Sequence, residues 1–197
     1  MRLFVALDIE EGIRKQIGSF MQQVRALAPD VRWVPPESLH VTLKFIGERP
    51  DAEVKRIEEA LGLICHPGFQ VCFRGCGFFP TPRAARVFWI GIEAEAALAS
   101  LAGGIESALG KLGIPEDKRA FSPHLTLARV GSGAPARQHG DGPNRRFFGL
   151  QQHLAQSPPP DFGTMTAREF FLYRSQLSSQ GARYTRIARF RLDTSDR

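Results

Sequence analysis

The chain has 197 residues, of which 43% are hydrophobic and 23% charged, an ordinary composition for a globular protein. It contains no apolar run near the ~20 residues that a membrane-spanning helix needs, and no basic leader precedes the short apolar N-terminus, so we expect neither a membrane span nor a signal peptide. Lys and Arg number 26 against 20 Asp and Glu, and the net charge of +6 favours an anionic ligand without establishing one.

The first third of the chain is predicted to alternate strands and helices. Arg2–Leu7 is rich in strand-forming residues, and apolar residues recur at helical spacing from about Glu10 to Leu27. His40–Gly47 is predicted to be the next strand. A second helix is then expected to begin after Pro50, with Asp51 as its N-cap.

The middle of the chain is predicted to contain three strands around one helix. The strands are expected at Gln70–Phe73, Arg86–Ile92 and Ser122–Val130. The helix is expected at Glu95–Leu112, where leucine and isoleucine residues form a single apolar stripe, and Gly113 is a natural stop for it.

The last third begins with a change of composition. Gly131–Arg146 is rich in Gly, Pro and Arg and has few apolar residues, so we predict a flexible basic loop. A short helix is expected at Phe147–Ala155, and final strands at Glu169–Ser175 and Tyr184–Leu192. Interleaved strands and helices must pack on one another, which predicts an α/β or α+β fold.

The three cysteines, Cys65, Cys72 and Cys76, form an odd set and favour a reducing, cytoplasmic setting over a disulfide framework. His66 lies beside them, which raises the possibility of a zinc site. The spacing matches no standard ligand pattern, however, and the sequence around Cys72 is typical of a buried strand. We therefore interpret these cysteines as thiols of the core.

A short segment occurs twice, 84 residues apart. Ser38–Glu48 and Ser122–Ser132 share Ser, His, Thr, Leu and Gly at five of eleven places, and both contain His-x-Thr-Leu, at His40–Leu43 and His124–Leu127. A single His-x-Thr is a weak signal, but a chain with only five histidines is not expected to contain two such motifs by chance. The repeat predicts two similar lobes, each with the same strand.

Alternate side chains of a strand point to the same face. His40 and Thr42 are thus expected to project together, with the following aliphatic residues in the core, and His124 and Thr126 likewise. Two lobes facing each other would then place two imidazoles and two hydroxyls around one cleft. Histidine titrates near neutral pH, so one imidazole can act as a base while the other acts as an acid.

This set of groups suits the hydrolysis of a strained cyclic phosphodiester, which needs a base to activate water and an acid for the leaving oxygen. The threonine hydroxyls can hold the phosphate oxygens, and a metal is less necessary. The alternative is that the histidines are structural, as single strand histidines usually are. His66, His139 and His153 lack the partner threonine and are interpreted as solvated or locally bonded.

The two motifs resemble those of the 2H phosphoesterases, and most closely the bacterial and archaeal RNA 2′,3′-cyclic phosphodiesterases, long called 2′-5′ RNA ligases. Arg32–Glu48 is similar to the family's first signature and Phe121–Arg129 to its second. Arg2–Asp8 resembles its opening strand. Ser175–Leu177, with Gly181 and Tyr184, resembles its C-terminal pattern. The resemblance implies one bilobal domain over residues 1–197, with two pseudo-symmetric α+β lobes. Each lobe is then an antiparallel sheet with helices on its outer face, and the active-site cleft lies between them.

The resemblance also implies roles. His40 is expected to be the proton donor and His124 the proton acceptor, and Arg129 matches the family's phosphate-binding arginine, although a surface ion pair is its alternative interpretation. The expected reaction opens cyclic phosphate ends of RNA or nucleotides to 2′-phosphates without metal or cofactor, in a cytoplasmic monomer. Reverse 2′-5′ ligation is a variant of this reaction, and a non-catalytic RNA-end-binding module is the rival hypothesis.

Two further groups of residues are candidates for RNA contact. The basic loop is long for the family, and it is either a spacer or a lid with arginines that bind phosphate; these are Arg137, Arg145 and Arg146. Three aromatic residues near the motifs are candidates for stacking on a base, although most of the fifteen Phe must lie in the core; these are Phe45, Phe79 and Phe121.

Overall fold

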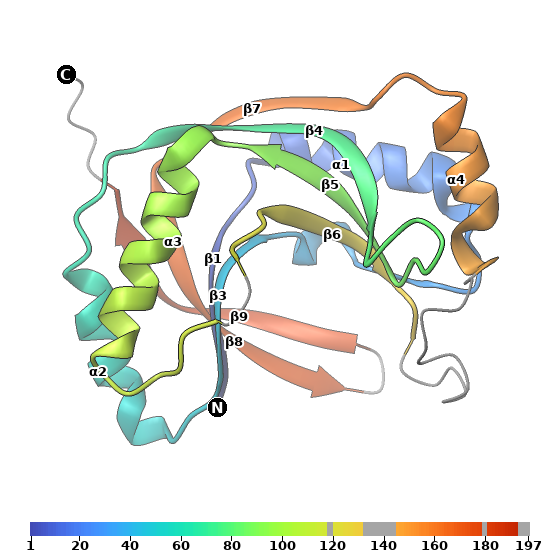
Figure 1. The fold of residues 1–197 in the computed structure, drawn as a ribbon. Helices are drawn as coiled ribbons and strands as arrows, with labels where there is room; N and C mark the ends of the chain where they lie inside the picture. The colour runs from blue at the N-terminus through green and yellow to red at the C-terminus, as the bar shows by residue number, and fades with distance from the viewer. Residues whose placement is uncertain (118–119, 132–144, 179–180, 193–197) are drawn as a thin grey trace.

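The computed structural model describes residues 1–117, 120–131, 145–178 and 181–192, which form two antiparallel sheets (Figure 1). Sheet A contains, in spatial order, β3 (Val41–Glu48), β1 (Arg2–Leu7), β8 (Glu169–Ser178) and β9 (Gly181–Arg191). Sheet B contains β2 (Arg32–Trp33), β6 (His124–Arg129), β5 (Val87–Glu93), β4 (Phe69–Phe79) and β7 (Asp161–Ala167). Each sheet therefore contains one of the two His-x-Thr motifs, as the repeat predicted.

Two of the helices each pack against the sheet that does not contain the strand before them. α1 (Glu11–Val24) follows a strand of sheet A but contacts β7 of sheet B, where α4 (Phe148–Ala155) lies near it (Figure 1). α3 (Glu95–Gly110) lies between two strands of sheet B but packs with α2 (Asp51–Gly62) against sheet A. The predicted α+β class is confirmed. Among the described residues, no helix is long and apolar enough to cross a membrane.

One hydrophobic core joins the two sheets. Leu3, Val5 and Leu7 alternate along β1 toward this core, and one face of α1 joins it through Ile13 and Ile17, all at most 5% exposed. Burial of each such side chain contributes about 1.5–3 kcal/mol relative to exposure. The opposite face of sheet A carries a small second cluster of Phe4, Ala6, Phe171 and Tyr173. His40 lies on this second face, where its ring packs against Phe4.

Two strands were not predicted. β7 has Gly163 at a positive φ of 93° in its middle, and its buried Phe162 and Met165 are three residues apart, so the period of two is broken. β2 has only two residues, too few to give a pattern. β4 is also longer than the predicted Gln70–Phe73, because Gly75 at φ 68° lets the strand continue beyond an irregularity.

Three local predictions were wrong. Asp51 is the first residue of α2 rather than its N-cap, which is Pro50, and its carboxylate instead lies 3.7 Å from the Met1 amine. Cys65 is exposed and Cys72 only half-buried, because the strand alternation turns Cys72 away from its buried neighbours. Arg145 and the residues after it form a 3₁₀ helix, η4 (Arg145–Phe147), whereas 132–144 of the predicted basic loop lie outside the described residues.

Lys44 is buried in β3 and connects this strand to α3. Lys44 pairs with Val5 and Thr42 with Ala6, so Leu43 is a bulge and both Leu43 and Lys44 face the core. The Lys44 Nζ lies 2.8 Å from the Glu106 carboxylate, and it donates to the Pro115 carbonyl at 2.9 Å. An amine with 1% side-chain exposure is tolerable only with such partners.

We predict that Lys44→Ala lowers the free energy of unfolding by about 3–5 kcal/mol, because it leaves Glu106 without its buried cation. Urea denaturation measures this value. The double variant Lys44→Met/Glu106→Leu should recover most of the loss, and Lys15→Ala, which removes an exposed pair with Glu11, should change stability by less than about 1 kcal/mol. A loss below about 1 kcal/mol for Lys44→Ala would contradict this account.

Candidate active site

The chain brings the first motif to the second by crossing from sheet B to sheet A. β2 pairs with β6, Arg32 opposite Arg129 and Trp33 opposite Ala128, and the Val34 amide donates to the Leu127 carbonyl at 2.8 Å. The chain then turns through η2 (Pro36–Ser38) and enters β3, which contacts β6. A segment six to eight residues before His40 is thus hydrogen-bonded to the strand that carries His124.

The two motifs have the same backbone plan. Val41 and Leu43, and likewise Leu125 and Leu127, are at most 3% exposed and lie in the core, whereas both histidines and both threonines are half-buried on the opposite face, as predicted. β6 has a bulge at Leu127, since Trp89 pairs with Thr126 and Phe88 with Ala128. It matches the bulge in β3, so Phe45 and Arg129 take equivalent positions on the faces that carry His40 and His124.

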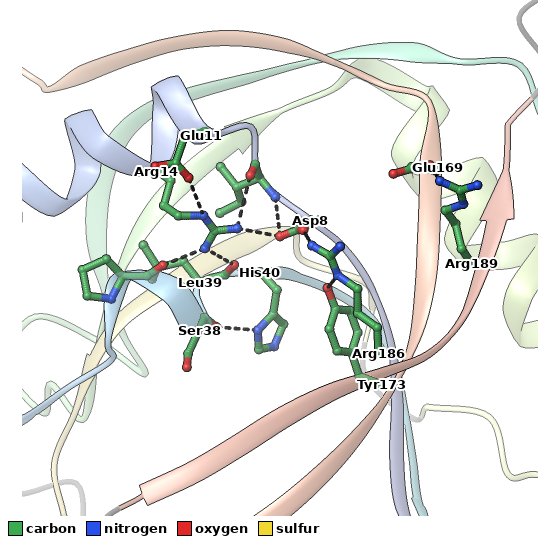
Figure 2. Close-up of polar contacts among 12 residues, drawn as sticks. Asp8, Glu11, Arg14, Ser38, Leu39, His40, Glu169, Tyr173, Arg186 and Arg189 are labelled. Atoms are coloured by element: carbon green, nitrogen blue, oxygen red, sulfur yellow. Dashed lines mark hydrogen bonds and ion pairs between the residues drawn. The ribbon is translucent and has the colours of Figure 1, made fainter.

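Each imidazole is held in the same way. The Nδ1 atom of His40 lies 2.8 Å from the Ser38 carbonyl oxygen (Figure 2), and the Nδ1 atom of His124 lies 2.8 Å from the Ser122 carbonyl oxygen. A carbonyl oxygen only accepts hydrogen bonds, so Nδ1 carries the proton in both rings. Each neutral imidazole therefore keeps its lone pair on Nε2, where it can accept a proton, and each imidazolium can donate one from the same atom.

Aromatic rings surround both imidazoles. The His40 ring centroid lies 4.8 Å from that of Phe4 and 5.0 Å from that of Tyr184, which meets it edge-on. Phe79 meets His124 edge-on at 5.0 Å. These contacts fix the ring orientations and remove water from around them.

Burial and a shared cation favour neutral imidazoles. The pKa of His40 is lowered from 6.5 to about 4, mainly by burial, while the Ser38 hydrogen bond opposes the shift and the charges of Arg129 and Arg14 add to it. The pKa of His124 is also lowered, first by burial and then by Arg129, again against its carbonyl hydrogen bond. One guanidinium thus acts on both rings. Arg129 donates from Nη2 to the Thr126 Oγ1 at 3.1 Å, and partial burial lowers its own pKa.

A pocket of about 460 Å³ adjoins His40 on the sheet A side. Arg14, from α1, anchors its wall: the guanidinium donates to the Asp8 carboxylate at 2.6 Å and to the carbonyls of Pro36 and Leu39 at 2.7 and 3.2 Å (Figure 2). Leu39 directly precedes His40, so Arg14 positions the start of the motif. Asp8 and Arg14 were not predicted as site residues, because they lie 32 and 26 residues before His40 and no sequence pattern links them to the motif.

The remaining sequence candidates have separate locations. His66 is half-buried with its Nδ1 near the Pro67 carbonyl, and His153 is exposed on α4, so both are locally bonded or solvated as interpreted from the sequence. His139 and Arg137 lie outside the described residues. Phe45 is 56% exposed, and Phe121 is half-buried. Within the described parts of the chain, no cluster of three or more His, Cys, Asp or Glu side chains is arranged to hold a metal ion.

Comparison with known proteins identifies the family. The model of the LigT-like phosphoesterases matches residues 7–89 and again 90–184, one match for each motif. An RNA 2′,3′-cyclic phosphodiesterase of Archaeoglobus fulgidus is 35% identical over 93% of this chain and 96% of its own, and one of Thermus thermophilus is 34% identical over 98% and 90%. The chain belongs to the LigT-like phosphoesterase family.

Solved structures agree with this assignment. The crystal structure of the Thermus thermophilus protein TT0787 superimposes with a TM-score of 0.77 at 32% identity, and each chain is covered completely. Escherichia coli LigT complexed with 3′-AMP superimposes with a TM-score of 0.76 at 30% identity, over 97% of both chains. The arrangement of two sheets with one motif in each is therefore that of the family.

We predict that Arg129→Gln raises the pKa of both His40 and His124, because a nearby cation disfavours each imidazolium. Titration of the imidazole signals by NMR measures both values in the free protein. Arg74→Gln is the matched control, since Arg74 pairs with Asp161 at the far side of sheet B and should leave both values unchanged. A shift of only one histidine would contradict the shared position of Arg129.

Proposed function

We propose that this chain hydrolyses RNA 2′,3′-cyclic phosphate ends to 2′-phosphates by general acid–base catalysis with two histidines, and that residues 1–197 act as one bilobal domain. The observation that carries the proposal is the matched pair of imidazoles, each with Nδ1 held by a carbonyl and Nε2 left for proton transfer, with one arginine acting on both. The names of the relatives support the same reaction.

In this reaction His124 removes a proton from water, whose oxygen forms a bond to phosphorus. The bond from phosphorus to the ribose O3′ breaks on the opposite side, and His40 gives its Nε2 proton to O3′. The product is a 2′-phosphate, and the two histidines exchange protonation states with solvent before the next turnover. Each proton transfer is typically worth 10²–10⁴-fold in rate. The assignment of His40 as donor and His124 as acceptor follows the family resemblance.

Because the pKa of His40 is low in the free protein, this histidine needs the charge of the substrate to become protonated and act as the acid. In the free protein, burial and two arginines keep this imidazole neutral at pH 7. The cyclic phosphodiester brings a negative charge between the histidines, which opposes the effect of Arg129 and raises the pKa of both rings. His40 therefore takes up its proton together with the substrate.

The residues that flank the histidines would bind the phosphate. Thr42 and Thr126 offer hydroxyl donors to the non-bridging oxygens from the two strands, and Arg129 stabilises the charge that develops on them. Phe45, which occupies in the first motif the place of Arg129 in the second, presents an exposed ring on which a base can stack.

The same residues account for two further properties in the proposal. Two imidazoles supply both acid and base, and the strained five-membered ring supplies driving force, so the reaction proceeds without a metal. By microscopic reversibility the site can also join a cyclic phosphate end to a 5′-hydroxyl. Water is in such excess that hydrolysis dominates for unstructured RNA.

The test is hydrolysis of adenosine 2′,3′-cyclic phosphate in the presence of EDTA. We predict turnover by the wild type and a loss of at least about 10²-fold in kcat for both His40→Ala and His124→Ala. His66→Ala, which alters a half-buried and locally bonded histidine outside the two motifs, is the matched control and should keep full activity. This assay does not depend on the separate expectation that the protein is a monomer in the cytoplasm.

Each other outcome has a distinct meaning. Full activity in either motif variant would contradict the site, and activity lost with EDTA and restored by a divalent cation would indicate a metal enzyme. Binding of the substrate without turnover by the wild type would indicate the rival RNA-end-binding module.

A further inference from the structure

The pocket beside His40 extends away from the two motifs, where the cyclic phosphate would bind. All of its lining residues come from 8–40 and 173–186, on the sheet A side of the motifs. Its volume of about 460 Å³ is within the usual range of pockets for small ligands and suffices for one nucleotide unit. His40 lines it, so a substrate with its cyclic phosphate at the histidines has this space directly beside it.

The charges in the pocket favour an anion. Three arginines line it, Arg14, Arg183 and Arg186, against two carboxylates, Asp8 and Glu37. The Asp8 carboxylate accepts hydrogen bonds from both Arg14 and Arg186 (Figure 2), so one negative charge serves two guanidinium groups. Arg14 also lies 3.9 Å from the exposed carboxylate of Glu11, which does not line the pocket. The surplus positive charge therefore belongs to the lining as a whole, with three guanidinium groups against two carboxylates.

Arg186 is held in position although its side chain is 55% exposed. Its Nε donates to the Tyr173 hydroxyl at 3.2 Å, and its guanidinium carbon lies 4.6 Å above the centre of the Phe171 ring. Together with the hydrogen bond to Asp8, these contacts hold the planar guanidinium group of Arg186 at the pocket. A guanidinium that is already ordered loses little entropy when it binds a phosphate.

Tyr173 adds a neutral donor beside this arginine. Burial raises the pKa of its hydroxyl to about 12, so it is protonated at neutral pH. The oxygen accepts from Arg186, which leaves the O–H to donate to an incoming oxygen. Tyr173 and Arg186 lie opposite each other on the paired strands β8 and β9 and together present donors to the pocket.

We propose that this pocket binds the phosphate on the 5′ oxygen of the nucleotide whose cyclic phosphate is opened, with Arg186 and Arg183 as its cationic partners. The inference rests on the proposed function. The ribose that carries the cyclic phosphate continues into the RNA chain only through its 5′ oxygen, so the next anion of the substrate is this phosphate. The enzyme then distinguishes an RNA end from a free nucleoside cyclic phosphate.

The test compares kcat/KM for three substrates: adenosine 2′,3′-cyclic phosphate, the same compound with a 5′-phosphate, and the dinucleotide ApA with a cyclic end. We predict that the 5′-phosphate alone raises kcat/KM by about 10- to 100-fold, as expected for a charge-assisted contact, and that this advantage shrinks with salt. The dinucleotide should show the same advantage, which separates the phosphate from the second base.

Variants then locate the effect. Arg186→Gln and Arg183→Gln should each reduce the 5′-phosphate advantage by about 10-fold, and the second leaves the Asp8 contacts in place. Arg189→Gln is the matched control. Arg189 is on the same strand, is 57% exposed and pairs with Glu169 at 3.7 Å (Figure 2), but it does not line the pocket and should leave the advantage unchanged.

Two results would overturn the proposal. The first is an equal kcat/KM of the wild type for adenosine 2′,3′-cyclic phosphate with and without the 5′-phosphate. The second is that Arg186→Gln and Arg183→Gln each lower kcat/KM equally for these two compounds. If the wild type hydrolyses none of the three compounds, the proposed function fails instead. Their affinities, measured by calorimetry, then decide the pocket: tighter binding of the 5′-phosphorylated compound supports it, and equal binding overturns it.

Discussion

The pairing of β2 with β6 sets the position of the first motif relative to the second. Two residues of the first half of the chain, Arg32 and Trp33, add to the edge of sheet B, and the Val34 amide continues the pairing. The chain then has only a few residues in which to reach sheet A, where β3 begins at Val41. His40 is therefore fixed beside the strand of the second motif, and Arg14 holds the intervening segment through its carbonyls.

The two motifs share a backbone plan but differ in one side chain on the face that carries the histidine. Bulges at Leu43 and Leu127 put one further residue of each strand into the core, Lys44 in one lobe and Ala128 in the other. The residue after each is then returned to the same face as the histidine. This residue is Phe45 in the first lobe and Arg129 in the second. The two lobes thus have similar backbones but different side chains at this position.

Much of the fold and of the site's plan could be predicted from local patterns. Strand-forming residues located β1, helical spacing located α1 to α3, and the repeated His-x-Thr-Leu motif placed the histidines and threonines on one face of each strand. These features depend on residues close together in the chain. The repeat already aligns Phe45 with Arg129, but their position on the faces that carry the histidines depends on the bulges, which the sequence pattern does not reveal.

The rest depends on contacts between distant residues. β7 was missed because Gly163 breaks its alternation, and β2 because two residues form no pattern. The ion cluster of Asp8 with Arg14 and Arg186 joins the first strand to the last, and no spacing rule predicts it. The lowered pKa of His40 likewise arises from burial under aromatic rings and from Arg129, which is 89 residues away in the chain.

In the proposed mechanism, the two histidines act as one unit on one phosphorus atom. A comparison of kcat for His40→Ala, His124→Ala and the double variant tests this cooperation. Groups that work in the same step are not additive, so we predict that the double variant is within a few-fold of the slower single variant. Losses that multiply in the double variant would show that the histidines act independently and would contradict the mechanism.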